Sequence, residues 1–266
     1  MDTGVKDKIV VATGASEGIG KAIAKAFLHE GATVVICSHS PDKLETARDE
    51  LAQSGGQVLA VTADLSTAEG ANTLKQRTLE AFGTVHVLIN NVGVPGNFAP
   101  FMDLSDEDWQ WVFEVNVMSA VRVSRVFIPS MQKQKWGRII HMASESGVQP
   151  DAVAPQYGMT KAALINLTKS MSKAFASDNI LVNAISPAFV MTSMLRGMIE
   201  GRAKQLGVGF EEAVSNLLRN YRPHIELKRP GRAEEVAAAA VFLASEQASF
   251  VTGINLRVDG GSVASL

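Results

Sequence analysis

A tyrosine and a lysine stand four residues apart near the middle of the chain. Tyr157 begins and Lys161 ends the run YGMTK, and Ser144 precedes the tyrosine by 13 residues. Residues four apart share one face of a helix, so the phenol and the ammonium can point into one cleft. A free tyrosine has a pKa of about 10, and a nearby cation favours the phenolate and so lowers that pKa. The pair therefore predicts a tyrosine that donates or accepts a proton with help from a lysine.

A glycine-rich turn follows the first apolar run. Gly14, Gly18 and Gly20 lie in the sequence TGASEGIG. Glycines there let the backbone pass closely beneath a pyrophosphate and enter a helix, whose N-terminal N–H groups and dipole favour an anion. A glycine triplet alone also fits an ordinary left-handed turn before a helix. Its position after an apolar run favours a dinucleotide site, and together with the tyrosine–lysine pair it predicts an enzyme that moves hydride.

Short apolar runs alternate with longer segments of helical periodicity. The expected strands are 8–13, 33–38, 57–61, 85–90, 138–142, 180–185 and 254–258. The expected helices are 18–30, 41–54, 67–82, 106–135, 155–177 and 233–245, with Ser40, Ser66 and Ser105 as N-caps. Strands separated by helices need crossovers, and runs such as IVVA are continuously apolar. We therefore predict an α/β fold with a doubly wound, parallel, seven-stranded sheet of the Rossmann type.

Ligands bind such sheets beyond the carboxyl ends of the strands. Gly14, Asn91, Ser144 and Pro187 fall at those ends, so four separate segments are expected to converge there. Residues 189–232 break the alternation with two helical pieces, 191–206 and 210–220, and no strand. We expect a single domain spanning 1–266, in which 189–232 form a lid over the substrate.

Composition argues against several classes of function. The 25 basic and 27 acidic residues are interspersed and give a net charge of −2, so no nucleic-acid partner is expected. The longest apolar run, 236–244, is much shorter than the ~20 residues that cross a bilayer. No signal-peptide core is recognised, and the lone Cys37 is expected to be a small core residue. We therefore expect a cytoplasmic protein without a membrane partner, and we assign no metal site.

Further motifs support the dinucleotide interpretation. The GxxxGxG spacing, the run NNVG at 90–93, the YxxxK pair and the run VDGG at 258–261 resemble the short-chain dehydrogenase/reductase family. The resemblance extends over essentially the whole chain and includes the 3-oxoacyl-carrier-protein reductases. The chain has Val92 where the family has alanine, and Ala188 where the family has glycine after proline.

The resemblance implies a catalytic tetrad of Asn116, Ser144, Tyr157 and Lys161. Tyr157 would protonate a carbonyl during reduction, and Ser144 would donate a hydrogen bond to the same oxygen. Lys161 would hold the ribose of the nicotinamide half and lower the tyrosine pKa. Asn116 would bind a water that relays protons, although an asparagine in a helix can equally satisfy backbone groups.

The resemblance also implies a set of cofactor contacts. These residues are Gly14, Ser16, Glu17, Gly18, Ile19, Gly20, Ser38, His39, Asp64, Leu65, Asn91, Gly93, Tyr157, Lys161, Pro187, Val190 and Thr192. Asp64 would accept a hydrogen bond from the adenine amino group, but its spacing equally fits a residue at a helix N-terminus.

The end of the second strand bears on the choice between NAD and NADP. An acidic residue there binds the ribose hydroxyls of NAD and repels a 2′-phosphate, and this chain has Ser38 instead. His39 can donate to a phosphate but is mostly neutral at pH 7. Glu17, in the glycine turn, opposes a phosphate. We predict that NADP is preferred over NAD.

These inferences predict an NADPH-dependent ketone reductase that works on a carbonyl or a secondary alcohol. The alternatives are an NAD-linked dehydrogenase of a polyol, hydroxysteroid or other alcohol, and a non-catalytic module that senses dinucleotides. Met191, Met194 and Met198 have the helical spacing more typical of core than of a substrate surface. By resemblance, a homotetramer or homodimer is expected, with contacts through the long helices and the segment 250–261.

Overall fold

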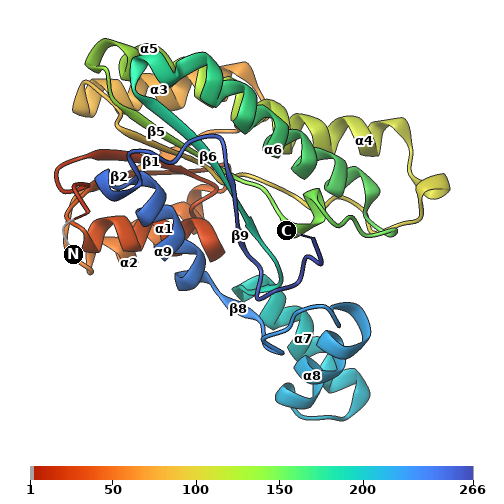
Figure 1. Cartoon of the computed structure of the whole chain (residues 1–266). Helices are drawn as coiled ribbons and strands as arrows, with labels where there is room; N and C mark the ends of the chain where they lie inside the picture. Colours follow the sequence, from red (N-terminus) through yellow and green to blue (C-terminus); the bar gives the residue numbers. More distant parts are fainter. Residues whose placement is uncertain (1–2, 266) are drawn as a thin grey trace.

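The structure is a computed structural model that describes residues 3–265. A twisted sheet lies between two layers of helices, and a smaller helical segment projects beyond one end of the sheet (Figure 1). The sheet has seven parallel strands in the order β3-β2-β1-β4-β5-β6-β9. Their bounds are Ile9–Thr13 (β1), Thr33–Ser38 (β2), Val58–Thr62 (β3), Val87–Asn90 (β4), Gly137–Met142 (β5), Ile180–Pro187 (β6) and Asn255–Val258 (β9). The predicted doubly wound sheet is confirmed.

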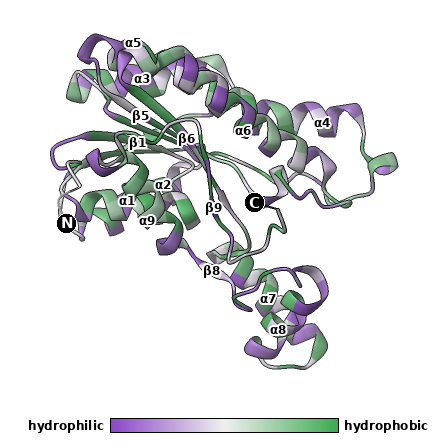
Figure 2. Cartoon of the chain, viewed as in Figure 1, coloured by the Kyte–Doolittle hydropathy of each residue, from purple (hydrophilic) through white to green (hydrophobic). Residues whose placement is uncertain are grey.

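The helices divide between the two faces of the sheet. One face is covered by α1 (Gly18–His29), α2 (Pro41–Ala52) and α9 (Ala233–Ala244), and the other by α3 (Ala68–Phe82), α5 (Ser119–Gln134) and α6 (Pro155–Phe175). Figure 2 shows that hydrophobic residues run along the central strands, as expected for strands that are covered by helices on both faces. Short 3₁₀ turns lie at Phe101–Asp103, Glu145–Gly147, Ala176–Asp178 and Glu246–Ala248.

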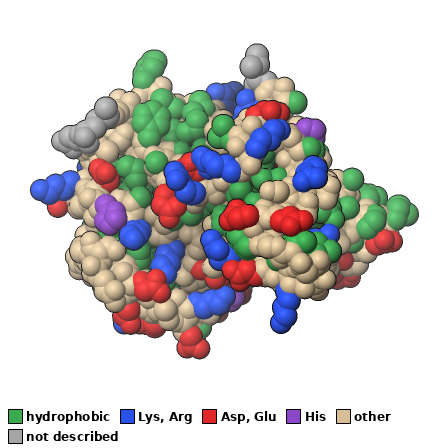
Figure 3. All heavy atoms as spheres, turned by 90° about the horizontal axis from the view of Figure 1, so that it is seen from below, with side chains coloured by type: hydrophobic (Ala, Val, Ile, Leu, Met, Phe, Trp, Pro, Cys, Tyr) green, Lys and Arg blue, Asp and Glu red, His purple; other side chains and the backbone are tan. Residues whose placement is uncertain are grey.

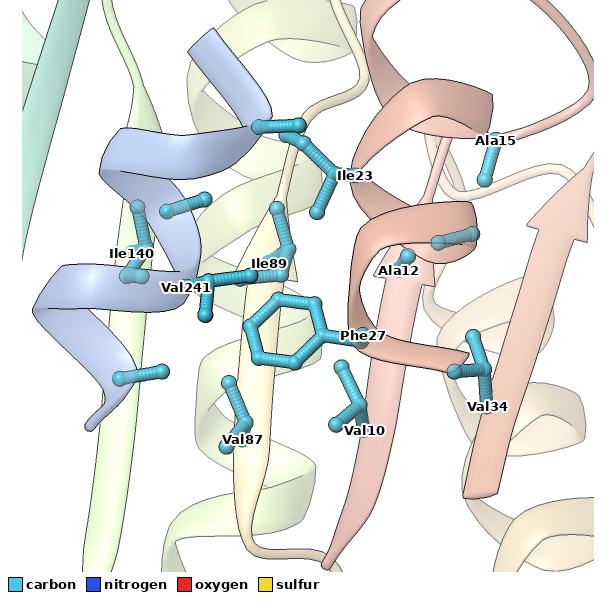
Figure 4. Packing of buried hydrophobic residues seen from close by; sticks show 14 of the residues in the cluster. Val10, Ala12, Ala15, Ile23, Phe27, Val34, Val87, Ile89, Ile140 and Val241 are labelled. Carbon is cyan, nitrogen blue, oxygen red and sulfur yellow. The ribbon is translucent and has the colours of Figure 1, made fainter. Parts of the chain in front are cut away.

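The packing of α1 illustrates how the core is built. Ile23 and Phe27 are four residues apart on one face of α1, and both are fully buried. Figure 4 shows the Phe27 ring among Val10 and Val87 of the sheet, close to Val241 of α9. Complete burial of one such side chain stabilises the fold by about 1.5–3 kcal/mol. This packing holds α1 against the sheet.

The predicted helix 106–135 is interrupted by a wider turn. It consists of α4 (Asp106–Phe113), a π-helical turn (Glu114–Met118) and α5. Ser105 caps α4 as predicted, in a capping box with Asp108. A π-helical turn inside a helix is rare and often lies at a functional site.

The predicted N-cap of the third helix is wrong by one residue. Thr67, not Ser66, caps α3 and accepts a hydrogen bond from the Gly70 amide at 3.0 Å. Ser66 is instead engaged with the carboxylate of Asp64, to which its hydroxyl donates at 2.7 Å.

Residues 189–232 form the projecting segment, which we call the α7–α8 segment. It contains α7 (Ser193–Leu206) and α8 (Phe210–Tyr221), and its own apolar cluster includes Ile199, Val214 and Leu218. The expectation that it holds no strand is wrong, because β7 (Val190–Met191) pairs with β8 (Gly231–Arg232) at its base. Two-residue strands carry too little periodicity to be recognised in a sequence.

The surface and the helices agree with the composition. Figure 3 views the molecule from below, and basic and acidic side chains are interspersed over that face. Within residues 3–265, no helix combines the length and the apolar character required to span a bilayer.

Candidate active site

The glycine turn between β1 and α1 has the shape that its glycines predict. Gly14 and Gly18 have φ angles of 61° and 59°, in the left-handed region that favours glycine. A Cβ atom on Gly20 would lie 2.5 Å from the Asn91 Nδ2 atom, so no larger residue fits there. Glu17 is the N-cap residue of α1 but makes no side-chain hydrogen bond to its first turn. The N-terminal N–H groups of α1 therefore remain suited to an anion.

Asn91 holds this turn in place. Its Nδ2 atom donates to the carbonyl oxygens of Thr13 and Gly14, both at 3.0 Å. Its backbone N–H donates to the Thr13 hydroxyl at 2.9 Å, and that hydroxyl donates to the Ile89 carbonyl at 3.2 Å. The Asn91 side-chain amide thus joins the ends of β1 and β4 and shapes the surface that a cofactor would contact. This role of the side chain was not predicted from the sequence.

Two serines and a histidine lie at the end of β2. The Ser16 hydroxyl donates to the Ser38 hydroxyl at 3.2 Å, and the Ser40 amide donates to the same Ser38 atom at 3.3 Å. His39 is exposed beside them. The structure therefore brings the glycine turn and the predicted discriminating positions together.

Lys43 is a residue of this region that sequence reasoning missed. Its Nζ atom lies 3.2 Å from the Glu17 carboxylate, and both side chains are exposed. The charge of Glu17, which argued against a phosphate, is thus paired with a cation. Lys43 lies in the first turn of α2, directly after the end of β2, and that position is the signal from which it could have been found.

The contacts of Asp64 favour the alternative in which it is a residue near a helix N-terminus. Its Oδ1 atom accepts hydrogen bonds from the Ser66 hydroxyl at 2.7 Å and from the Ser66 amide at 3.0 Å. These bonds are the main reason that the pKa of Asp64 is lowered, and the charge of His39 lowers it further.

The side chains of Leu65 and Val190 are buried in apolar clusters, and that of Ile19 packs against one. Among these three residues, the backbone is the part that can face a cofactor.

Thr192 joins the α7–α8 segment to the glycine turn. Its side chain caps α7 by accepting a hydrogen bond from the Leu195 amide at 3.3 Å. A Cβ atom on Gly18 would lie 3.3 Å from the Thr192 methyl group. Pro187 ends β6 and is buried. The four predicted segments therefore converge at one edge of the sheet.

Lys161 is buried at this edge, with 3% of its surface exposed. Its Nζ atom donates to the Met142 carbonyl at 2.8 Å. Burial lowers the pKa of Lys161 to about 8. The Nζ atom lies 5.5 Å from the centroid of the Tyr157 ring, so the shared helix face predicted for the pair is observed.

The expected lowering of the Tyr157 pKa is wrong for this structure. Burial raises the pKa of Tyr157, and this effect exceeds the lowering by a hydrogen bond from the Ser144 side chain. The charge of Glu145 raises the pKa further, and that of Arg222 lowers it. How far water is removed from the phenol depends on the packing of separate segments and cannot be read from local spacing. Burial thus favours the protonated form of the Tyr157 phenol, and the Ser144 side chain lies near enough to act on it.

Asn116 lies in the π-helical turn and is almost fully buried. The Val94 amide donates to its Oδ1 atom at 2.7 Å, and its Nδ2 atom donates to the Val94 carbonyl at 2.9 Å. Nδ2 also donates to the Thr160 hydroxyl at 3.0 Å, one residue before Lys161. Both amide hydrogens are thus used, as in the alternative in which the asparagine satisfies backbone groups.

Gly93 lies close to the side chains of Lys161 and Asn116. A Cβ atom there would lie 3.0 Å from the Lys161 Nζ atom and 3.6 Å from the Asn116 Oδ1 atom. A larger residue at this position would therefore press on both. The close approach fits a site in which a ligand passes over the lysine.

Three further groups lie close to the site. His141 on β5 is completely buried, and burial together with the charge of Lys161 lowers its pKa to about 4. Glu145 follows Ser144, and Arg222 reaches it from the end of α8. The position of Glu145 beside Ser144 is the signal from which it could have been found.

The methionines of the α7–α8 segment do not follow the expected pattern. Met194 and Met198 are exposed by 63% and 61%, and only Met191 packs against the local cluster. Their interpretation as core residues is wrong for Met194 and Met198, because α7 buries a different face, which includes Ile199 and Ala203. Across residues 3–265, no group of three His, Cys, Asp or Glu side chains is placed to hold a metal ion. Cys37 is a buried core residue as expected, and burial raises the pKa of its thiol to about 12.

Several known proteins are similar in sequence to this chain over nearly its whole length, and one solved structure has the same fold. A family model described as enoyl-(acyl carrier protein) reductase matches residues 14–263. The uncharacterized oxidoreductase YvrD of Bacillus subtilis is 39% identical over 267 residues, covering 100% of both chains. The 3-oxoacyl-[acyl-carrier-protein] reductase FabG of Aquifex aeolicus is 32% identical, covering 98% of this chain and 99% of its own. The crystal structure of L-sorbose reductase from Gluconobacter frateurii, complexed with NADPH and L-sorbose, matches with a TM-score of 0.94 and 36% identity over 100% of both chains.

Proposed function

The chain belongs to the short-chain dehydrogenase/reductase family, and from that premise we propose that it is an NADPH-dependent ketone reductase. It is an oxidoreductase that acts on CH–OH and C=O groups with NAD(P). The observation that carries the finer proposal is the buried Lys161, whose Nζ atom lies 5.5 Å from the centroid of the Tyr157 ring, with Ser144 near enough to the phenol to lower its pKa. A phenol that retains its proton is ready to act as an acid when a carbonyl oxygen becomes negative.

Each residue of the tetrad is proposed to act on a definite atom. Ser144 and Tyr157 donate to the substrate carbonyl oxygen, and Tyr157 releases its proton to that oxygen as it gains charge. Lys161, which is mostly an ammonium at pH 7, holds the ribose hydroxyls of the cofactor. Asn116 fixes the turn that carries Val94 and is bonded to Thr160, so it supports Lys161 from the neighbouring helix. The nicotinamide supplies the hydride when it is bound.

The residues of the glycine turn fit the rest of the cofactor. The close approach at Gly20 and the free N-terminal N–H groups of α1 suit a pyrophosphate. Ser16, Ser38 and His39 offer donors to a 2′-phosphate, and Lys43 adds a cation that already offsets the charge of Glu17. These features support NADP over NAD, and L-sorbose reductase, which is similar to this chain, was solved with NADPH.

A substrate screen tests the function. Ketones and alcohols are offered with NADPH, NADH and the oxidised cofactors, and the absorbance of the reduced nicotinamide is followed. The panel includes L-sorbose and 3-oxoacyl thioesters, because the similar proteins carry those names. We expect reduction of at least one ketone, faster with NADPH. Tight NADPH binding without turnover of any compound would favour a dinucleotide sensor, and faster oxidation of a polyol or hydroxysteroid with NAD would favour an NAD-linked dehydrogenase.

The cofactor preference has its own test in Ser38→Asp. A carboxylate at this position repels the 2′-phosphate and accepts hydrogen bonds from the ribose hydroxyls of NADH. We expect NADPH to bind at least about tenfold more weakly, or about 1.4 kcal/mol, while NADH binding improves. Dissociation constants from nicotinamide fluorescence measure both, and Lys43→Gln is the companion variant, expected to weaken NADPH alone. Equal loss for both cofactors would show that Ser38 does not discriminate between them.

We also propose the remaining arrangements inferred from the family. The chain acts as a single domain in which the α7–α8 segment covers the substrate. Association into a homodimer or homotetramer is supported by the position of β9 at the edge of the sheet and by the full exposure of Phe250. Sedimentation at several concentrations measures the oligomeric state directly.

A further inference from the structure

A buried carboxylate lies beside the proposed acid. Glu145 follows Ser144 directly and opens a 3₁₀ turn, and only 7% of its surface is exposed. Its Oε2 atom is buried without a hydrogen bond of good geometry among the described residues, although Ser262 lies near enough to lower the pKa of the carboxyl. Burial is the stronger influence and raises that pKa. Such a carboxylate needs a cation to remain charged at little free-energy cost.

Arg222 provides that cation from a distant segment. It follows the last residue of α8, and its Nε atom lies 3.6 Å from the Glu145 Oε1 atom. The same guanidinium donates to both carboxylate oxygens of Asp151, at 3.1 and 2.7 Å. This two-bond arrangement fixes the guanidinium plane as a lysine could not. One arginine therefore joins the α7–α8 segment to the turn after Ser144 and to the loop before α6.

The charges around Glu145 are unevenly balanced. Asp151 and Asp259 add negative charge near it, and Arg222 is the cation that acts on it. The same Glu145 and Arg222 act on the Tyr157 phenol with opposite signs. Lys161, which shares α6 with Tyr157, places its Nζ atom 5.5 Å from the centroid of the phenol ring.

We propose that Arg222 is a positioning residue of the reaction: by pairing with Asp151 and Glu145, it holds the Ser144 turn in place and offsets the charge of Glu145 beside the Tyr157 phenol. The inference rests on the proposed function, because it assigns the α7–α8 segment a part in the proton-donating step. Loss of Arg222 leaves Glu145 with Asp151 and Asp259 as acidic neighbours and removes the cation that acts on it among residues 3–265. The phenol then holds its proton more tightly and gives it up less readily.

The titration of Tyr157 tests this without any substrate. The chain has two tyrosines, Tyr157 and Tyr221, so ¹³C-labelled tyrosine gives two ring signals, and Tyr157→Phe identifies the one that matters. In Arg222→Gln we expect the Tyr157 titration to move to higher pH by roughly half a unit or more, within the range that neighbouring charges produce. Arg222→Lys keeps the charge without the two-bond geometry and should give an intermediate shift. Arg222→Gln combined with Glu145→Gln should return the titration to the wild-type value or below.

Controls separate this effect from a loss of folding. Arg196→Gln removes an exposed arginine of the same segment, 3.9 Å from Glu200, and should leave the titration unchanged. If Arg222→Gln does not fold, as judged by near-ultraviolet circular dichroism, Glu145→Gln alone still has to lower the pH of the Tyr157 titration.

The activity profile gives a second readout. In the reduction of the substrate found by the screen, the alkaline limb of kcat against pH should move in the same direction as the phenol titration. An unchanged Tyr157 titration in Arg222→Gln, or an equal upward shift in the double variant, would overturn the inference. Because the titration needs no substrate, failure to reduce any ketone would count against the proposed function while the inference on Arg222 is still decided.

Discussion

The two ends of the parallel sheet each bury a cation beside an aromatic ring, but they satisfy these cations in different ways. At the carboxyl end, Lys161 lies 5.5 Å from the centroid of the Tyr157 ring. At the amino end, the Arg138 guanidinium lies 4.2 Å from the centroid of the Trp136 ring. The partners of the two cations show which end is built for stability and which for chemistry.

At the amino end, the buried Arg138 guanidinium has several partners, although its Nε atom makes no hydrogen bond among the described residues. Lys8 lies 4.4 Å from the centroid of the same Trp136 ring, and the indole N–H donates to Glu246 at 2.8 Å. Glu246 also lies 3.7 Å from the buried Arg138 guanidinium. Burial lowers the pKa of Arg138, and the charge of Glu246 raises it. His86 completes the cluster with an edge contact to Trp136 and accepts a hydrogen bond from the Ile9 amide.

At the carboxyl end, two bases are buried without such compensation. The pKa of Lys161 is about 8 through burial alone, and that of His141 is about 4 through burial and the charge of Lys161. The Nε2 atom of His141 is buried without a hydrogen-bond partner among the described residues. Perturbed groups of this kind cluster at functional sites. The comparison shows that the buried Arg138 at the amino end faces a carboxylate, whereas Lys161, where the cofactor is proposed to bind, has the Met142 carbonyl as its hydrogen-bond partner and no carboxylate among the described residues.

The largest effect should follow from Tyr157→Phe at the carboxyl end. The phenyl ring keeps the shape of the side chain but removes the proton that the carbonyl oxygen needs. We expect kcat/KM to fall by ~10²–10⁴-fold, with NADPH binding and the urea midpoint nearly unchanged. Steady-state kinetics and urea unfolding measure the two properties. If the variant retained more than about a tenth of the wild-type rate, Tyr157 would not be the acid.

Lys161→Met should reveal how burial of the lysine makes the stability of the fold depend on pH. Burial lowers the pKa of Lys161 from its ordinary 10.5 to about 8, so between these pH values the unfolded chain binds more protons than the folded one. Wild-type stability contributed by this group therefore rises with pH through this window, by about 3 kcal/mol in total. The variant lacks that rise, so its free energy of unfolding relative to wild type should fall by the same amount between pH 7 and 10.5. Urea unfolding at several pH values checks this, and a constant difference would mean that Lys161 titrates normally.

The sequence predicted the sheet because its signal is local. The continuous apolar runs at 8–13 and 85–90 correspond to Ile9–Thr13 and Val87–Asn90, with errors of one or two residues at the ends. That four separate segments meet at one site followed from the rule that ligands lie beyond the carboxyl ends of parallel strands. These parts needed only periodicity and strand direction.

The remaining features depend on contacts between distant residues. The Lys43–Glu17 pair spans 26 positions and the Arg222–Asp151 pair spans 71, and no local pattern relates such residues. The direction of the Tyr157 pKa was predicted wrongly for the same reason, because burial of the phenol depends on how separate segments pack around it.

The smallest effect of this series should come from the amino end, with Trp136→Ala. This change removes two cation–ring contacts and the hydrogen bond to Glu246, and it leaves the Arg138 guanidinium buried without its ring. We expect a loss of about 2 kcal/mol in the free energy of unfolding. Because the cluster lies at the opposite end of the strands from Tyr157, kcat and the NADPH dissociation constant should be unchanged. Trp111→Ala is the matched control, since Trp111 is 53% exposed and lies outside this cluster. A fall in kcat for Trp136→Ala with little loss of stability would reverse the roles assigned to the two ends of the sheet.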